Sequence, residues 1–104
     1  MRSYKLYFEI MNFLINNTRQ LGVVTKKVRK RQSLDQSSLG LLSHNGITFV
    51  SNFENGKDTV EIGRVFRILE TLGIEVHLDL PETLSAQDET DLLAELSLLS
   101  RDRK

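Results

Sequence analysis

Residues 36–56, QSSLGLLSHNGITFVSNFENG, contain two short helical patterns separated by a tight turn. The first pattern, about 36–43, points Leu39 and Leu42 inward, and HNG at 44–46 is a turn signal. The second pattern, about 47–54, places Val50 and Phe53 on one face. This predicts a pair of helices packed through the turn, with further apolar side chains left on the outer sides of the second helix.

Further helices are predicted on both sides of this pair. Residues 19–32 have apolar residues at spacings of three and four, and Asp35 is placed to cap the helix that follows. Asp58 and Glu61 have the spacing of a capping box for another helix, which Gly73 would end. The predicted apolar face of that helix consists of Ile62, Val65, Phe66, Leu69 and Leu72.

The C-terminal part reads as a strand followed by a helix. Residues 74–80 alternate strictly between apolar and polar side chains, which predicts a half-buried β-strand ended by Pro81. A lone strand has unpaired edges, so it needs the N-terminal segment or a second subunit, and pairing across a two-fold axis is the simplest solution. Ser85 and Asp88 can cap a last helix over about 86–100, whose apolar stripe is Leu92, Leu93, Leu96 and Leu99.

Residues 1–17 form an apolar N-terminal extension. Periodicity does not decide between a strand and a buried helix for residues 4–15. Extra dimer core is the favoured role for this extension, and a docking surface for a partner protein is the alternative. The same two roles apply to the C-terminal leucine stripe.

Composition and charge restrict the class of protein. A chain of 104 residues predicts one compact domain, and no segment is long enough to span a bilayer. The absence of cysteine excludes disulfides and thiol chemistry and fits a reducing cytosol. Residues 1–78 carry 11 Lys/Arg against 7 Asp/Glu, whereas residues 79–104 carry 3 against 7. The basic part favours an anionic partner. Its densest run, Lys26 to Arg31, is interpreted first as a solvated helix face and second as a phosphate-contacting surface.

Catalytic and metal-binding patterns are missing from the sequence. His44 and His77 lack metal-ligand spacing, and no segment resembles a nucleophile elbow. Gly63 and Gly73 lie in or after a helix and build no phosphate loop. No cofactor and no metal are therefore expected, and a binding role is favoured over an enzymatic one. The paired helices form the skeleton of a helix-turn-helix domain, in which the second helix enters the DNA major groove.

Residues 20–80 resemble the Xre/Cro-repressor helix-turn-helix family. The family pattern has LTQ, a Leu-Ala pair, an apolar residue in the third helix and ENG or ERG, matched here by Leu34-Asp35-Gln36, Leu39-Gly40, Val50 and Glu54-Asn55-Gly56. SNFEN at 51–55 followed by residues 66–80 looks most like HipB antitoxins, the DNA-binding partners of HipA-type kinase toxins. The resemblance implies a mainly α, lambda-repressor-like bundle with a short C-terminal strand paired across a dimer.

Site residues follow from the same resemblance. Positions that reach base edges are matched by Ile47, Thr48 and Asn52, with Ser51 beside them. Asparagine can bond bidentately to adenine, and apolar groups can pack on thymine methyls. Phosphate-contacting positions are matched by Gln36, Asn55 and Lys57, although a mere surface lysine is an equally good interpretation of Lys57. Arg29 and Glu54 match a structural ion pair between the first and third helices.

Four positions depart from the family pattern. Ser33 replaces the usual glycine after the first helix, where a left-handed backbone would strain it. Asn45 replaces an apolar residue in the turn, Gly46 replaces a Ser/Thr cap, and Phe49 is large at a site that is often small and polar. Either the turn is repacked or this surface is not a standard DNA reader.

The expected organisation is an N-terminal extension (1–17), a helix-turn-helix domain (18–73), a dimerisation strand (74–80) and an acidic C-terminal helix (81–104). The expected function is a sequence-specific, homodimeric repressor that binds double-stranded operator DNA. The resemblance to HipB further implies a bacterial cytoplasmic, nucleoid-associated antitoxin that binds a HipA-type kinase toxin, possibly with an accessory subunit. The alternatives are a protein-interaction module that binds DNA weakly and a stand-alone phage-type repressor.

Overall fold

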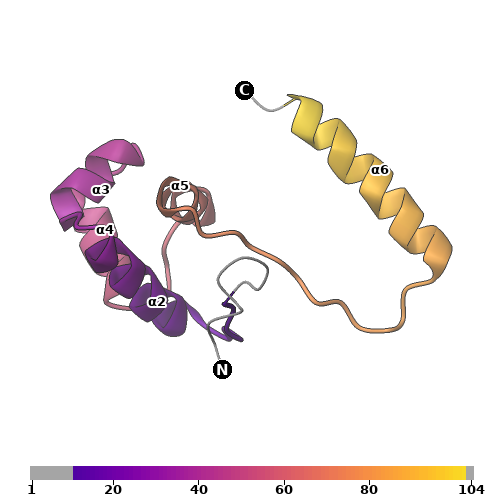
Figure 1. Cartoon of the computed structure of the whole chain (residues 1–104), viewed down its shortest axis with the longest axis horizontal. Helices are drawn as coiled ribbons and strands as arrows, with labels where there is room; N and C mark the ends of the chain where they lie inside the picture. The colour runs from indigo at the N-terminus through magenta and orange to yellow at the C-terminus, as the bar shows by residue number, and fades with distance from the viewer. Residues whose placement is uncertain (1–10, 103–104) are drawn as a thin grey trace.

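The computed structural model describes residues 11–102, with side chains described up to residue 100, and contains five helices within that range (Figure 1). They are α2 (Thr18–Arg31), α3 (Gln36–Leu42), α4 (Ile47–Glu54), α5 (Ile62–Leu72) and α6 (Ala86–Asp102). Helices α2 to α5 gather into a bundle, whereas α6 lies apart from it at the end of an extended stretch of chain (Figure 1). No helix among the described residues is long and apolar enough to cross a membrane.

The core lies where α4 and α5 meet the other helices of the bundle. Helix α4 packs against both α2 and α3, and α5 packs across the same pair. Val50 and Phe53 of α4 are fully buried, which confirms the prediction that they point inward. The buried apolar side chains are Leu39, Val50, Phe53, Val65, Ile68, Leu69 and Leu72. Each such side chain contributes roughly 1.5–3 kcal/mol when it leaves water.

Gly22 allows α2 to approach the end of α4 very closely. A Cβ atom at this position would lie 2.5 Å from the carbonyl oxygen of Phe53 and 2.9 Å from that of Glu54. Real Cβ atoms do not come so near to backbone oxygens, so only glycine fits between the two helices here. This contact fixes the spacing of α2 and α4 at the point where their charged residues also meet.

Most of the predicted helix ends are confirmed. The Asp35 carboxylate accepts a hydrogen bond of 2.7 Å from the backbone N–H of Ser38 and so caps α3. Ser85 and Asp88 form the reciprocal bonds of a capping box at the start of α6, at 2.9 and 3.1 Å. Gly73 ends α5 in the left-handed conformation, with φ of 78°.

The predicted capping box of α5 is wrong. The helix begins at Ile62, and its N-cap residue, Glu61, makes no side-chain capping bond. The Glu61 carboxylate pairs instead with Arg64, 3.2 Å away on the next turn. Val60 packs partly buried against the core, so residues 58–61 run into the helix rather than forming its first turn. The N-cap of α5 is therefore Glu61, three residues after the predicted cap at Asp58.

The predicted β-strand at 74–80 is absent, because residues 11–102 contain no strand. Residues 75–80 form no backbone–backbone hydrogen bond with other described residues, and their side chains are exposed. A strand requires a hydrogen-bonded neighbour, and residues 11–102 of a single copy bring none to this segment. At the N-terminus, the question of strand or helix for residues 4–15 falls mainly on residues outside the described range, and residues 11–16 form neither.

Candidate nucleic-acid interface

Helix α4 presents four of the predicted site residues on one outward side. Ile47 and Thr48 lie in its first turn and are exposed, and Ser51 and Asn52 lie one turn later and are half-buried. The spacing of four between Ile47 and Ser51, and between Thr48 and Asn52, stacks them on adjacent turns of the same face. Gly46 precedes the helix and has no side chain to cap it, so the first N–H groups of α4 keep no side-chain partner.

The three predicted phosphate-contacting residues lie at the edges of α4. Asn55 and Lys57 are exposed in the loop after the helix, and the Lys57 backbone N–H donates to the Asn52 carbonyl at 3.0 Å. Gln36 begins α3 and is half-buried, because its amide donates a 3.0 Å hydrogen bond to the Glu54 carboxylate. The structure therefore gives Gln36 a structural role at the junction of α3 and α4.

Arg29 and Glu54 form a buried ion pair that joins α2 to α4. The Arg29 Nε and Nη2 atoms donate to the two carboxylate oxygens of Glu54 at 2.7 and 2.8 Å, and Nη1 donates to the Leu34 carbonyl at 2.9 Å. Burial alone would raise the pKa of Glu54, but the hydrogen bonds from Arg29 and Gln36 outweigh burial and lower that pKa. The hydrogen bond to Glu54 raises the pKa of Arg29. Both groups are therefore charged at neutral pH, and the bidentate geometry fixes the orientation of α4 against α2.

Polar contacts from α5 hold the turn between α3 and α4. The Asn45 amide donates to the carbonyl and hydroxyl oxygens of Ser43, at 3.2 and 3.1 Å. The Arg67 guanidinium donates to the same Ser43 carbonyl at 3.1 Å and reaches the Asn45 side-chain oxygen at 3.4 Å. Asn45 thus replaces an apolar contact with hydrogen bonds, so the turn is repacked rather than open.

Phe49 faces the protein rather than solvent. Its side chain is half-buried against the core cluster, and the Arg64 guanidinium carbon lies 5.5 Å from the centre of its ring. This cation–π contact ties α5 to the side of α4. Phe49 is consequently a packing residue, and the outward face of α4 is left to Ile47, Thr48, Ser51 and Asn52.

Two loop residues adopt left-handed backbone conformations without being glycine. Ser33, between α2 and α3, has φ of 61°, as predicted from its replacement of glycine. His44, in the turn before α4, also has φ of 61°, which the sequence did not indicate. Each of these conformations costs roughly 1–2 kcal/mol for a residue with a Cβ atom.

The basic run at 26–31 divides between surface and interior. Lys26, Lys27, Lys30 and Arg31 are exposed, whereas Arg29 is turned inward to Glu54. The run is therefore a solvated face interrupted by Arg29 and by Val28, which packs partly buried against the core. Arg64 and Arg67, which position the turn and α4, had no sequence signal because their partners are 15 to 24 residues away.

Comparisons with known proteins agree with this geometry. No protein-family model matches the chain. It is 34% identical over 67 residues to the uncharacterized HTH-type transcriptional regulator y4mF of Sinorhizobium fredii, covering 64% of this chain and 88% of that protein. A chain of the HipA-HipB-O2-O3 complex superposes with a TM-score of 0.63 at 28% identity, over 68% of this chain and all of the other.

Two further solved structures extend the comparison. A chain of the HipB-O4 20mer complex gives a TM-score of 0.62 at 28% identity, again over 68% of this chain and 100% of that chain. The restriction-modification controller protein C.AhdI from Aeromonas hydrophila shares the fold, with a TM-score of 0.51 at 24% identity over 56% of this chain and 84% of its own. The chain belongs to the Xre-type, HipB-like helix-turn-helix family of DNA-binding transcriptional regulators, which is not a family of enzymes.

Proposed function

We propose that this regulator is a homodimeric, sequence-specific repressor that reads a palindromic operator with α4 and serves as the antitoxin of a bacterial toxin–antitoxin operon. The observation that carries the proposal is the outward face of α4, held rigidly by Arg29–Glu54 on one side and by Arg64 and Arg67 on the other. A reading helix must be preorganised, because its side chains have to meet base edges in fixed register. The proposed site of action is the nucleoid in the bacterial cytoplasm.

Base recognition is assigned to four side chains of α4. Asn52 can form two hydrogen bonds with adenine, and Thr48 and Ser51 can bond to base edges through their hydroxyl groups. The exposed Ile47 side chain can pack on a thymine methyl group. Phosphate contacts are assigned to Asn55 and Lys57 in the loop after α4, and to Gln36, which also bonds Glu54 at the C-terminal end of that helix.

The packing of Asn45 and Phe49 favours this function over a protein-interaction module. Both residues depart from the family pattern, and both could have marked an apolar surface for a protein partner. Instead Asn45 is hydrogen-bonded within the turn and Phe49 lies under Arg64. Ile47 is then the one large apolar side chain left exposed on α4.

Dimerisation is assigned to pairing of residues 74–80 from two copies. Val76, Leu78 and Leu80 are exposed and alternate with polar residues, and residues 75–80 form no backbone–backbone hydrogen bond with other described residues. A hollow of about 640 Å³ lies beside it, lined by Phe66 and Leu69 of α5 together with Ile74 and Val76. Two antiparallel copies of the segment would satisfy each other's backbone and cover the apolar side chains of this hollow.

The antitoxin role rests on the match to HipB in the HipA-HipB-O2-O3 complex, which covers the whole of that chain. We assign a HipA-type kinase toxin, with or without an accessory subunit, as the protein partner. Co-expression of the tagged regulator with the product of the neighbouring gene tests this role. A stable, stoichiometric complex with a kinase-like protein supports it, and a repressor that binds DNA but no neighbouring gene product would be a stand-alone, phage-type regulator.

DNA binding is tested by gel shift on the protein's own upstream region at several salt concentrations. Thr48→Ala and Asn52→Ala should each weaken specific binding by about 1–3 kcal/mol. Thr90→Ala, on the distant helix α6, is the matched control and should bind as the wild type does. Specific affinity should also fall steeply as salt rises, because phosphate contacts release counterions. Unchanged binding by both α4 variants would remove these residues from the readout.

A further inference from the structure

Helix α6 is not packed against the bundle in the part of the chain that the structure describes. Every described side chain from residue 75 to residue 100 is exposed, and α6 lies away from the bundle (Figure 1). Helices in proteins gain most of their stability from packing of one face, and the 17 residues of α6 have no such packing within the described range. Its exposed large apolar side chains are Leu92, Leu93, Leu96, Leu98 and Leu99. This much exposed leucine on one element points to a contact that the described residues of a single copy do not supply.

Three of these leucines form a heptad seam. Leu92, Leu96 and Leu99 follow spacings of four and three, which is the repeat of a helix that pairs with another helix. The same spacing extends backward to Glu89, so the described seam is acidic at its beginning and apolar towards its end. The sequence that follows the seam, residues 101–104, is mainly basic.

This charge order is complementary to itself only when two copies run in opposite directions. Residues 86–95 carry four acidic side chains and no basic one, whereas residues 97–104 carry three basic side chains and one acidic. A parallel pair would place the acidic halves side by side, and like charges on adjacent helices repel. An antiparallel pair centred on Leu96 places the acidic half of each α6 beside the basic C-terminal residues of the other copy. We propose that α6 is a self-association helix that pairs antiparallel with α6 of a second copy of this chain.

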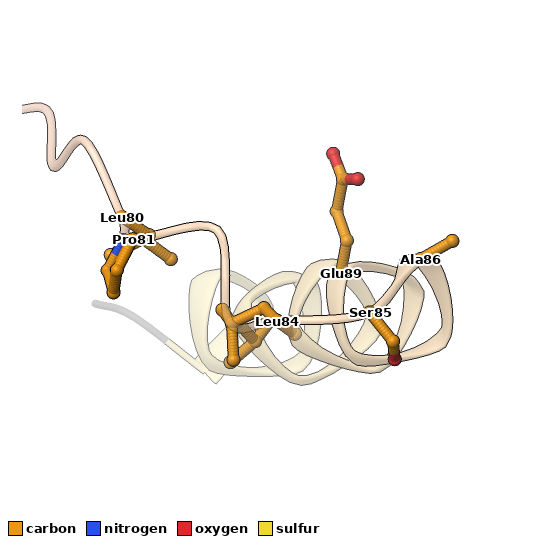
Figure 2. A pocket seen from close by; sticks show the side chains of 7 residues that line it. Leu80, Pro81, Leu84, Ser85, Ala86 and Glu89 are labelled. Atoms are coloured by element: carbon orange, nitrogen blue, oxygen red, sulfur yellow. The ribbon is translucent and has the colours of Figure 1, made fainter.

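The residues that lead into α6, from Leu80 to Ser85, extend the apolar surface at the acidic end of the seam. A shallow hollow of about 500 Å³ is formed where Leu80, Pro81 and Leu84 lead into the first turns of α6, with Leu92 on its lining (Figure 2). Leu84 and Leu92 are partly exposed there. The end of a partner helix centred on Leu96 would lie next to this hollow, so the contact continues beyond the three seam leucines.

A matched pair of substitutions tests the seam. Leu96 and Leu98 are both 58% exposed, but they differ by 200° around the helix, so only Leu96 lies on the seam. Sedimentation velocity of the full chain over a concentration series should show that Leu96→Glu raises the dissociation constant of self-association at least tenfold. Leu98→Glu should leave it unchanged, and the unfolding of the bundle should be the same in both variants. Equal effects of the two substitutions, or none from either, would overturn the proposal.

The antiparallel orientation of the two α6 helices is tested by reversing the charges of side chains in the acidic and basic parts of the C-terminal sequence. Glu89→Arg should weaken self-association, because it puts a positive charge into the acidic half that faces the basic C-terminal residues of the other copy. The double variant Glu89→Arg with Arg103→Glu should restore it. Because the chain has no cysteine, introduced cysteines give an independent readout. A mixture of differently tagged Leu92→Cys and Ser100→Cys chains should form mostly the mixed disulfide, whereas a preference for the two like disulfides would contradict antiparallel pairing.

The proposal does not depend on the operator, the toxin or pairing of residues 74–80. If the strand-paired dimer is wrong, the α6 variants still distinguish self-association through the seam from its absence. If α6 instead binds only a basic partner protein, the isolated chain shows no difference between Leu96→Glu and Leu98→Glu. That outcome would reject the second copy as occupant while leaving operator binding by α4 intact.

Discussion

Arg29 and Glu54 are 25 residues apart in the chain, yet two hydrogen bonds of 2.7 and 2.8 Å join them in the interior of the bundle. Arg29→Ala should destabilise the protein by about 3–5 kcal/mol, because it leaves the Glu54 carboxylate buried without its counter-charge. Urea unfolding followed by circular dichroism measures this loss. A change below about 1 kcal/mol would show that solvent reaches the carboxylate and that the pair does not hold the helices together.

The control for this prediction removes both charges. A variant with Arg29→Met and Glu54→Leu should be much less destabilised than the sum of the two single variants, because no uncompensated charge remains. Operator affinity should nevertheless fall if the ion pair orients α4. This variant would then lose DNA affinity without a comparable loss of unfolding free energy. Additive losses of stability would contradict direct coupling between the two residues.

The stability of the bundle should fall in acid through Glu54. Its pKa is lowered below the usual value of 4.5, so its contribution is complete above pH 4.5 and is lost as pH falls through the lower folded-state value. The raised pKa of Arg29 keeps that residue charged throughout this range. Unfolding free energies of the wild type and Glu54→Gln should therefore converge as pH drops from 6 to 3. A constant difference across this range would assign the acid sensitivity to other carboxylates.

Ser33→Gly should stabilise the protein by about 1 kcal/mol, since glycine adopts the observed φ of 61° without a Cβ clash. Thermal unfolding should show the gain as a rise of several degrees in Tm. Ser37→Gly is the matched control, because Ser37 is also exposed but lies within α3. There the same substitution should cost about 0.5–1 kcal/mol. A loss at Ser33 would show that its left-handed conformation is relieved in solution.

Two glycines in helices should respond in opposite directions to alanine. Gly22→Ala should cost about 1–3 kcal/mol, because the new methyl group would meet the Phe53 and Glu54 carbonyl oxygens. Gly63→Ala in α5 meets nothing within 4 Å and should gain up to about 1 kcal/mol from helix propensity. Chemical denaturation of both variants checks the pair. Similar stability in the two variants would mean that α2 and α4 can move apart freely.

Local patterns in the sequence predicted the helices of the bundle well, because helix periodicity and caps are encoded by neighbouring residues. The Asp35 cap, the Gly73 terminus and the strain at Ser33 all follow from such short-range signals. The capping box predicted at Asp58 is wrong for a tertiary reason. Val60 packs against the core, so α5 begins only at Ile62. The absent strand at 74–80 has a different cause, because alternation indicates which face is apolar but cannot supply a hydrogen-bonded neighbour.

The contacts that orient α4 were less accessible to prediction. The contacts of Arg64 with Phe49 and of Arg67 with Ser43 connect residues 15 and 24 positions apart, and no periodicity relates them. The need for glycine at position 22 likewise could not be predicted from neighbouring residues. The carbonyl oxygens that exclude a Cβ atom there belong to Phe53 and Glu54, more than 30 residues away. The surface residues of α4 were predictable from the family pattern. The contacts that support these residues from the protein side join positions far apart in the sequence, so they could be identified only in the folded structure.

The segment from residue 74 to residue 85 also sets how strong an α6 contact needs to be. Twelve residues reach at most about 40 Å, so each α6 can search only a small volume around its bundle. Copies brought together on one operator would meet at effective concentrations in the millimolar range. A helix pair that is only partly populated between free molecules would then be fully occupied on DNA, and neighbouring operators would be filled together rather than one at a time.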